Sequence, residues 1–356
     1  MKAGHRVTVL TTSRHDAVEK EEKNGFTIRF LTPSTPMKLS KSWFKESLSV
    51  VRELHAEAPI DVIHSNEFAA KGIIRWARKN AIPMAVVCHG SLRTELLSFL
   101  SAADMRPRYW HWLLLTPMHL IRRCILWEIP MRKASRSIIL VSPTLKRDFS
   151  AYSKGKVRVI ENGITLPDPP KRRASSDKLR LLCTGRADKQ KGFQTAIRAV
   201  SKMEDVPLHL DIVGTGPYFE DLKAISTHLN VDDRVTFHGR VEDDELSRIY
   251  SSADVYLIPT TRYEGLPLAL LEAMSHGIPT ISSDIGGNSD VITHGSDGLF
   301  IKPGDLSELI EAIHRLESDP AERHAISEAA RATAERRFDK HRMISETLEV
   351  LESIAG

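Results

Sequence analysis

TTRYEGLPLALLEAMSHG, residues 260–277, combines a turn with the start of a helix and carries two carboxylates eight positions apart. Pro267 is expected as the first helical residue, because a proline there loses no hydrogen bond. Glu264 then lies in the preceding loop, and Glu272 lies about one and a half turns into the helix. The free amides of the first turn would seat a phosphate between them. We therefore expect two anchors for hydroxyl groups of an extended ligand; the alternative is a pair of solvated surface acids.

The segments around this stretch alternate between strands and helices along the whole chain. Such alternation predicts an α/β protein with two doubly wound Rossmann-like domains, whose parallel sheets carry helices on both faces. A ligand crevice is then expected between the domains, at the carboxyl ends of the strands. The expected strands are His5–Thr12, Phe26–Leu31, Asp61–Asn66, Pro83–Gly90, Arg136–Ser142, Val157–Gly163, Leu179–Thr184, Leu208–Val213, Val235–His238, Val255–Pro259, Thr280–Ser283 and Gly298–Ile301.

The expected boundaries follow from a Pro-rich and then Ser-rich run in mid-chain, which is typical of a linker. Residues 1–165 form the first domain, residues 166–178 the linker and residues 179–338 the second domain. Residues 339–356 form a final amphipathic helix.

The composition is that of an ordinary globular protein, with 41% hydrophobic and 27% charged residues. The three cysteines lie far apart in apolar runs, so we expect no structural disulfide and a cytoplasmic location. No apolar run is long enough to span a membrane. No Asp-x-Asp and no His/Cys cluster has metal-ligand spacing, so neither a metal nor another cofactor is expected.

The net charge of +4 conceals an asymmetry between the halves. Lys and Arg are in excess in residues 1–170, whereas Asp and Glu are in excess in residues 171–356. A basic half favours an anionic partner such as phospholipid headgroups, a lipid-linked diphosphate or a polyanionic glycan. Nucleic acid is not expected as a partner, because the basic residues are scattered and accompany no binding module.

The carboxylate pair is followed by the patterns Ala-Met-x-x-Gly-x-Pro (residues 273–279) and Ser-Asp-x-Gly-Gly (residues 283–287). This combination resembles the donor site of the family 4 retaining glycosyltransferases, nucleotide-sugar enzymes of the GT-B fold. The resemblance implies metal-independent transfer of a hexose from a nucleoside diphosphate to a glycan or lipid-linked acceptor, with retention of configuration. It also implies that the final helix packs back on the first domain. A same-fold epimerase or phosphorylase is a less favoured alternative.

The resemblance assigns roles to residues of the second domain. Arg186 and Lys191 would hold the donor diphosphate and stabilise its developing charge; the alternative is that they only solvate a helix start. Glu272 would accept both ribose hydroxyls and Glu264 the hydroxyls of the transferred sugar. The donor-binding set is Gly185, Gly214, Gly216, Gly239, Arg240, Gly265, Leu266, Leu268 and Glu272.

In the first domain, His89 follows a buried strand and matches the family's histidine near the reacting centre. Together with Arg186, Lys191 and Glu264 it makes up the catalytic set, positioning the sugar or polarising its 6-hydroxyl. If the enzyme inverted configuration, His89 would be the candidate general base; a purely structural histidine is the alternative. Asn66, Glu67 and Asn162 are expected on the acceptor side, although turn formation alone would explain an Asn-Gly pair.

Two further features leave the function open. The resembled enzymes begin with a strand, a Gly-rich turn and a helix before the segment found here at Gly4–Thr11, so roughly 25 residues are absent. The absent strand would be central, which exposes edges on both neighbours. A non-catalytic nucleotide-sugar-binding partner subunit is therefore the rival function.

Residues 106–127 combine aromatics, aliphatics and Arg, which suits either attachment to the inner face of a membrane or a core helix interrupted by Pro117.

Overall fold

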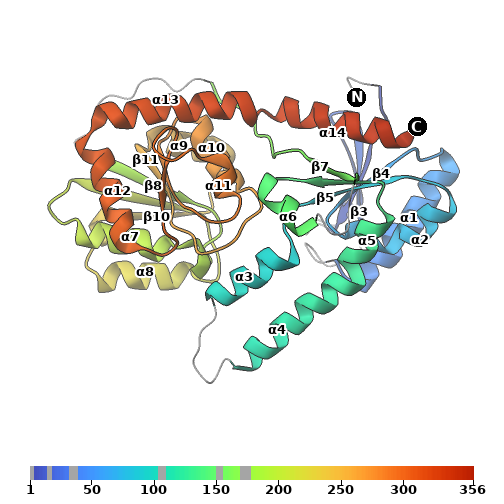
Figure 1. The fold of residues 1–356 in the computed structure, drawn as a ribbon, viewed down its shortest axis with the longest axis horizontal. Helices are drawn as coiled ribbons and strands as arrows, with labels where there is room; N and C mark the ends of the chain where they lie inside the picture. Colours follow the sequence, from blue (N-terminus) through green and yellow to red (C-terminus); the bar gives the residue numbers. More distant parts are fainter. Residues whose placement is uncertain (1–3, 14–17, 32–38, 103–109, 150–154, 169–177) are drawn as a thin grey trace.

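The computed structural model describes residues 4–13, 18–31, 39–102, 110–149, 155–168 and 178–356. Two α/β halves lie side by side and are joined at one edge by the long helices of the C-terminus (Figure 1). The two-domain α/β fold with parallel sheets is therefore confirmed. Most of the predicted linker, residues 169–177, lies outside the described residues.

The second half is built on one sheet with the order β10-β9-β8-β11-β12-β13, in which every pairing is parallel. Its strands are nearly continuous apolar runs, as a sheet covered on both faces requires. All four residues of β11 and of β12 are buried. The bounds are β8 Leu179–Thr184, β9 Leu208–Val213, β10 Val235–Gly239, β11 Val255–Ile258, β12 Thr280–Ser283 and β13 Leu299–Ile301.

Helices cover this sheet through apolar side chains that recur every three or four positions. In α7, Phe193, Ala196, Ile197 and Val200 are all buried on the sheet side. The last three helices each begin at an aspartate whose carboxylate accepts a backbone N–H, which fixes their starts. The bounds are η6 Lys189–Lys191, α7 Phe193–Lys202, α8 Phe219–His228, η7 Asp232–Arg234, α9 Asp243–Ser252, α10 Leu268–Ser275, α11 Asn288–Val291, α12 Leu306–Ser318, α13 Pro320–Arg337 and α14 Lys340–Ala355.

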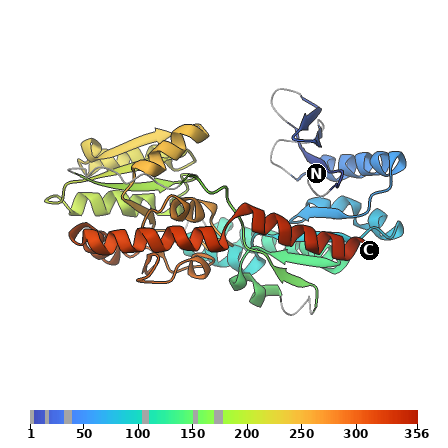
Figure 2. The same cartoon turned by 90° about the horizontal axis from the view of Figure 1, so that it is seen from above.

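The first half has two sheets instead of one. A four-stranded parallel sheet has the order β4-β5-β6-β7, and a separate three-stranded sheet has the order β1-β3-β2. The two sheets stand apart in the view from above (Figure 2). Among the described residues β1 pairs only with β3 and β4 only with β5, so both are edge strands. The bounds are β1 Thr8–Thr12, β2 Lys20–Lys23, β3 Phe26–Leu31, β4 Ile63–Asn66, β5 Met84–Cys88, β6 Ser137–Leu140 and β7 Val157–Val159.

Two details of the first half differ from the sequence prediction. The strand β2 consists of four charged residues, KEEK, and pairs antiparallel with β3. Its sequence has no apolar pattern from which a strand could be predicted. After β4, residues 69–79 form a 3₁₀ turn followed by a short α-helix instead of one continuous helix. The helical elements are α1 Lys41–Glu57, η1 Ala69–Ile73, α2 Ile74–Lys79, α3 Leu92–Ala102, α4 Trp110–Arg123, the π-helix η3 Cys124–Glu128, α5 Ile129–Ala134, η4 Pro143–Leu145 and α6 Lys146–Phe149.

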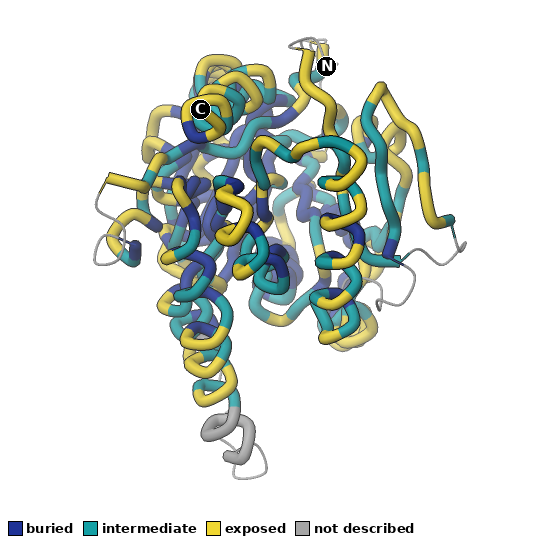
Figure 3. The backbone as a smooth tube through the Cα atoms, turned by 90° about the vertical axis from the view of Figure 1, so that its right-hand side faces the viewer, coloured by how far each residue is buried: buried dark blue, intermediate teal, exposed yellow. Residues whose placement is uncertain are grey.

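The described part of the aromatic and basic stretch at residues 106–127 forms α4 and most of η3, with Cys124 buried and Met118, Ile121, Ile125 and Leu126 exposed. Residues 106–109 lie outside the described part, and Pro117 is accommodated inside α4. Figure 3 shows α4 extending away from the body of the molecule. Within the described ranges, no helix has both the length and the apolar character needed to cross a membrane.

The final helix α14 returns to the first half of the chain. Lys340 donates its backbone N–H to the Ile164 carbonyl at 2.9 Å, and Ile164 forms a parallel bridge with Asp339. At the far end of α14, Arg136 donates to the Ile354 carbonyl at 3.2 Å. The ion pair of Arg337 with Glu161, at 2.6 Å, adds to this junction.

Candidate active site

The loop before α10 meets the first half of the chain through direct backbone contact. A Cβ placed on Gly265 would lie 2.0 Å from the carbonyl oxygen of His89, and one on Gly287 would lie 1.7 Å from the carbonyl oxygen of Gly265. Asn162 donates its side-chain N–H to the Leu266 carbonyl at 3.2 Å. Three of the predicted site residues, His89, Gly265 and Asn162, are therefore brought together from both halves.

Further contacts from α3 hold the same loop. The hydroxyl of Ser98 accepts the backbone N–H of Tyr263 at 2.9 Å. Gln190, in η6, donates its side-chain N–H to the Ser98 carbonyl. Sequence reasoning missed both residues, because their relation to the loop exists only once α3 has packed against η6.

Glu264 and Lys191 form an ion pair, with 2.5 Å between Nζ and the carboxylate. Both side chains are about one-fifth exposed, at 20% and 21%, so they are neither freely solvated nor enclosed. Gly192 follows Lys191 with a φ of +76°, and a Cβ there would lie 1.8 Å from the Pro259 carbonyl oxygen. The close passage of these two chain segments is what places Lys191 beside Glu264.

Arg186 lies at the turn after β8, and its side chain is 67% exposed, with the guanidinium 3.4 Å from Asp188. The exposed Arg186 side chain can reorient toward a ligand, whereas the Lys191 ammonium is already paired with the Glu264 carboxylate. The two cations predicted to act together therefore stand in different surroundings.

Glu272 lies in α10 and accepts a hydrogen bond from the Tyr250 hydroxyl at 2.9 Å. Burial raises the pKa of this carboxyl, opposed by the Tyr250 hydrogen bond, while Asp243 raises it further. The Thr184 hydroxyl hydrogen-bonds with the hydroxyls of Tyr250 and Tyr256, at 2.8 and 2.7 Å. This buried network holds Glu272 in one orientation.

Sequence reasoning missed the two tyrosines of this network. Burial raises the pKa of Tyr250 well above its usual value, so its hydroxyl stays protonated and donates to Glu272. Tyr250 comes from α9 and Tyr256 from β11, and no local pattern links either residue to α10. Only the packed sheet brings them together.

The start of α10 differs by one position from the prediction. Pro267 is the N-cap, with extended backbone, and the helix begins at Leu268. Among the described residues, the backbone N–H groups of Leu268 and Ala269 have no hydrogen-bond acceptor. Leu266 is buried and Leu268 is half exposed, at 50%. The two N–H groups at this helix start are suited to an anion.

Gly185, Gly214, Gly216 and Gly239 of the predicted donor set lie at the ends of β8, β9 and β10 or in the turns after them, and the turns at Gly214 and Gly216 are tightly packed. A Cβ on Gly214, which has a φ of +122°, would lie 1.9 Å from the Gly185 carbonyl oxygen. A Cβ on Gly216 would lie 2.6 Å from that of Ala187. Gly214 donates its N–H to the Gly239 carbonyl at 2.7 Å, and the adjoining Arg240 is exposed. These turns lie at the carboxyl ends of the strands of the six-stranded sheet.

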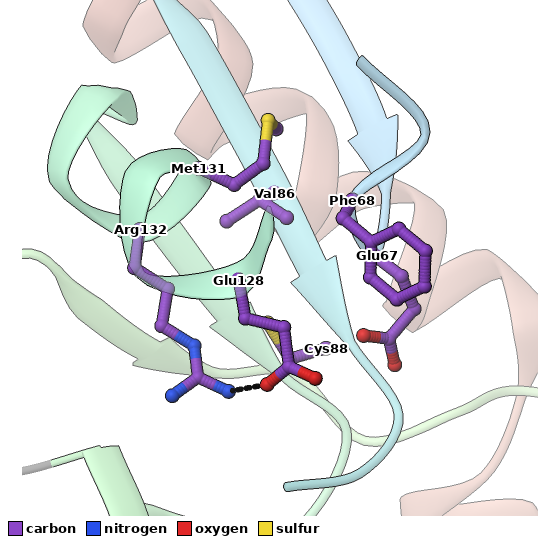
Figure 4. A pocket seen from close by; sticks show the side chains of 7 residues that line it. All are labelled: Glu67, Phe68, Val86, Cys88, Glu128, Met131 and Arg132. Carbon is purple, nitrogen blue, oxygen red and sulfur yellow. Dashed lines mark hydrogen bonds and ion pairs between the residues drawn. The ribbon is translucent and has the colours of Figure 1, made fainter. Parts of the chain in front are cut away.

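In the first half, a small pocket lies between β5 and the helices η3 and α5, with Glu67 in its wall (Figure 4). Glu67 accepts the backbone N–H of His89 at 2.7 Å and adopts a φ of +50°, which is uncommon for a residue with a side chain. Burial raises the pKa of its carboxyl to about 7, with Glu128 and Glu95 adding to the rise. Asn66 is exposed beside it. The lining residues are Glu67, Phe68, Val86, Cys88, Glu128, Met131 and Arg132.

His89 itself has an exposed surface, but desolvation of its ring by the surrounding protein lowers the pKa, which favours the neutral imidazole. The nearby Glu128 is buried and paired with Arg132 at 2.8 Å and with Arg123 at 3.0 Å. These three residues were not predicted. Among the residues that the structure describes, no group of three or more His, Cys, Asp or Glu side chains could hold a metal ion.

Comparison with known proteins identifies the chain. Residues 1–166 match the model of Glycosyltransferase Family 4, and residues 167–333 match that of Glycosyl transferases group 1. The chain belongs to the family 4 glycosyltransferases. Its sequence is 34% identical over 223 residues to the lipopolysaccharide core biosynthesis glycosyltransferase LpsD of Rhizobium meliloti, covering 61% of this chain and 64% of that protein.

Solved glycosyltransferase structures share the fold. Sucrose-phosphate synthase from Thermosynechococcus elongatus superimposes with a TM-score of 0.82 at 21% identity, covering 99% of this chain and 90% of that one. Anabaena HepE in complex with UDP-glucose superimposes with a TM-score of 0.71 at 20% identity, covering 92% and 86%. The chain spans between 51% and 64% of the length of the curated relatives that it matches first.

Proposed function

We propose that the protein transfers a hexose from a nucleoside-diphosphate sugar to a hydroxyl of a glycan or lipid-linked acceptor, with retention of configuration and without a metal. The observation that carries this proposal is the meeting of Lys191–Glu264, the α10 amides and His89 at one junction between the domains. HepE, which shares the fold, has been solved in complex with UDP-glucose. The name of another relative, a GDP-mannose-dependent mannosyltransferase, also specifies a nucleotide-sugar donor.

Each group has a task in this proposal. The diphosphate binds at the start of α10, where unpaired N–H groups and the helix dipole favour negative charge. When the bond between the sugar and the phosphate breaks, charge develops on the leaving diphosphate, and Arg186 and Lys191 stabilise it. Lys191 is released from Glu264 for this task, and Glu264 then accepts hydroxyls of the sugar.

Glu272 holds the ribose, because a carboxylate oriented by Tyr250 accepts two hydroxyl donors. The acceptor enters past Glu67 and Asn66 and attacks the sugar on the face that the diphosphate leaves. The departing phosphate takes the proton of the attacking hydroxyl, so no separate base is needed. His89, held neutral, positions the sugar and hydrogen-bonds its 6-hydroxyl.

The alternative is a non-catalytic subunit that binds a nucleotide sugar and partners a complete transferase. The observation that favours it is the division of the first-half sheet, because β4, which ends at the proposed acceptor-side residue Asn66, is an edge strand among the described residues. We also propose a cytoplasmic location, in keeping with the buried free thiols of Cys88, Cys124 and Cys183.

One experiment separates these functions. UDP-, GDP- and ADP-sugars are tested for thermal stabilisation of the protein and for turnover with and without EDTA, and the anomeric configuration of any product is read by NMR. Stabilisation by one donor together with EDTA-resistant, retaining turnover is the expected result. Stabilisation without turnover on any acceptor supports the partner subunit, and no stabilisation by any donor contradicts both.

A further inference from the structure

The helix α3 and the residue before it bury a row of hydroxyl side chains on one face. Ser91, Thr94 and Ser98 follow one another at intervals of three and four residues, so they lie on the same side of the helix. Their exposed fractions are only 4%, 4% and 8%. Buried polar side chains are normally hydrogen-bonded, so the partners of this row show which segments α3 holds.

The start of the row is tied to the first half of the chain. The Ser91 hydroxyl donates to the Asp148 carboxylate at 2.5 Å, and the Asp148 side chain, in α6, is only 7% exposed. Ser91 and Thr94 also cap the helix, because the hydroxyl of each accepts the backbone N–H of the other, at 3.1 and 2.8 Å. These bonds give the start of α3 a fixed position in the first half, two residues after His89.

The other end of the row contacts two segments of the second half, and Figure 1 shows α3 between the two halves. The Ser98 hydroxyl accepts the Tyr263 N–H at 2.9 Å, and the Ser98 carbonyl accepts the side-chain N–H of Gln190. Tyr263 directly precedes Glu264, and Gln190 directly precedes Lys191. One residue of the first half therefore bonds to the chain neighbours of both members of the Lys191–Glu264 ion pair.

We propose that Ser98 is a positioning residue for the sugar transfer, which sets Lys191 and Glu264 relative to the first half of the chain. The inference rests on the proposed function, in which Glu264 binds the sugar and Lys191 the leaving diphosphate. When the donor separates this ion pair, the two side chains no longer hold each other, whereas the bonds to Ser98 still fix both backbone segments. Ser98 acts through Tyr263 and Gln190 and does not itself need to touch the donor.

The first test is calorimetry of Ser98→Ala and the wild type with a nucleotide sugar and with its free nucleoside diphosphate. In the variant the Tyr263 N–H loses its acceptor, so the loop with Glu264 is less well placed for the sugar. We expect the affinity for the nucleotide sugar to fall about fivefold and kcat about tenfold. The affinity for the free diphosphate should stay within about twofold, because the Gln190 bond to the Ser98 carbonyl is kept.

Gln190→Met tests the second contact and should give a different pattern. The variant keeps the length of the side chain but loses the N–H that donates to the Ser98 carbonyl. Lys191 should then hold the diphosphate less well, so the affinities for the nucleotide sugar and for the free diphosphate both fall about fivefold. Unchanged affinities for both ligands would show that the Ser98 carbonyl does not position Lys191.

Ser135 provides a matched control for the loss of a buried hydroxyl. Its hydroxyl donates to the Met131 carbonyl four residues earlier at 2.8 Å, as that of Ser98 does to Thr94 at 2.8 Å. Ser135 is fully buried at the end of α5, away from the second half. Ser135→Ala is expected to leave both affinities and kcat unchanged. An equal loss in Ser135→Ala and Ser98→Ala, or wild-type affinity for the nucleotide sugar in Ser98→Ala, contradicts the proposal.

Hydrogen exchange tests the contact without any ligand. The Tyr263 amide, followed in a peptide that covers residues 260–266, is expected to exchange about tenfold faster in Ser98→Ala than in the wild type or Ser135→Ala. If this amide loses protection but the wild type binds no nucleotide sugar, the proposed function fails and Ser98 remains only an anchor of the loop. If the wild type turns over a donor and Ser98→Ala matches it in every measurement, the function stands and the role given to Ser98 is wrong.

Discussion

The sheets of the two halves are assembled from similar strands but reach different degrees of burial. In β8, at the centre of the second sheet, five of the six residues are buried and Arg180 is partly exposed. In β1 no residue is buried, and Val9 is 39% exposed. A parallel strand is normally covered on both faces and paired on both edges. β8 has both partners, whereas β1 has one.

This difference separates the scaffold of the site from its more open side. The residues proposed to bind the donor lie at the strand ends of a continuous six-stranded sheet, where packing fixes their positions. Asn66 and Glu67, proposed for the acceptor side, lie at the end of β4 and directly after it, and β4 is an edge strand with one described pairing partner. We therefore expect the site residues of the second half to be held in fixed positions, and those of the first half to move more easily. The predictions below test that division, beginning where the two halves touch.

The largest effect is expected at Gly265, where the loop from the well-packed half contacts the His89 backbone. Gly265→Ala places a Cβ 2.0 Å from the His89 carbonyl oxygen, so one half must move relative to the other. Misplacement by about 1 Å costs about 100-fold in rate, and we expect a loss of about 1000-fold in kcat/KM. The measurement is steady-state kinetics with the donor found in the stabilisation screen.

The matched control is Gly90→Ala, one residue beyond His89, where a Cβ would lie at an ordinary 3.5 Å from the Thr94 hydroxyl. Gly265 does not have a positive φ, so any loss arises from space alone and not from backbone strain. Equal activities for Gly265→Ala and Gly90→Ala would mean that the two halves are not held together in this way during turnover.

Hydrogen exchange should sharpen the comparison directly. Amides in β8, β9 and β11 are expected to exchange about 100-fold more slowly than those in β1, because opening β1 disturbs few buried apolar contacts. Peptides covering Thr8–Thr12 and Leu179–Thr184 report the two regions in one mass-spectrometry experiment. Equal protection in both peptides would show that β1 is covered in solution, contrary to the exposure seen here.

A smaller effect is expected within the well-packed half, at Glu272. Glu272→Ala removes the carboxylate that Tyr250 orients. We expect the affinity for the nucleotide to fall about 50-fold, because losing hydrogen bonds to a charged group costs about 1.5–3 kcal/mol. Tyr250→Phe should weaken binding less, because the carboxylate stays and only its orientation is lost. Calorimetry with the free nucleoside diphosphate measures both; a Tyr250→Phe loss as large as that of Glu272→Ala would show that the network, not the carboxylate, carries the affinity.

The same division explains what the sequence could predict. Apolar runs mark buried strands, so the strands of the second sheet and the places of Glu264 and Glu272 follow from local pattern. The KEEK strand β2 could not be predicted this way, because charged edge strands carry no apolar period. The Tyr250–Glu272 bond and the Lys191–Glu264 pair join segments that only the folded sheet brings together. Periodicity predicts elements, whereas these side-chain pairings depend on tertiary packing.

The smallest effect concerns the open half and depends on pH. The pKa of Glu67 is raised to about 7 in the folded protein from an ordinary value near 4.5. Below pH 4.5 the carboxyl is protonated in both states, so its favourable contribution to folding is complete. Between pH 4.5 and 7 the unfolded carboxyl ionises first, and the stability is lost as pH rises through the folded pKa.

Glu67→Gln keeps an oxygen that can accept the His89 N–H but cannot ionise. Its free energy of unfolding is expected to exceed that of the wild type by about 1–2 kcal/mol at pH 8 and to match it near pH 4.5, since one pKa unit corresponds to about 1.4 kcal/mol and partial exposure reduces the effect. Urea titrations at the two pH values measure it, with Glu349→Gln on the exposed face of α14 as the control. A gain of the same size at both pH values would mean that Glu67 acts through shape and hydrogen bonding alone, and that the carboxyl beside His89 is not a buried titrating group.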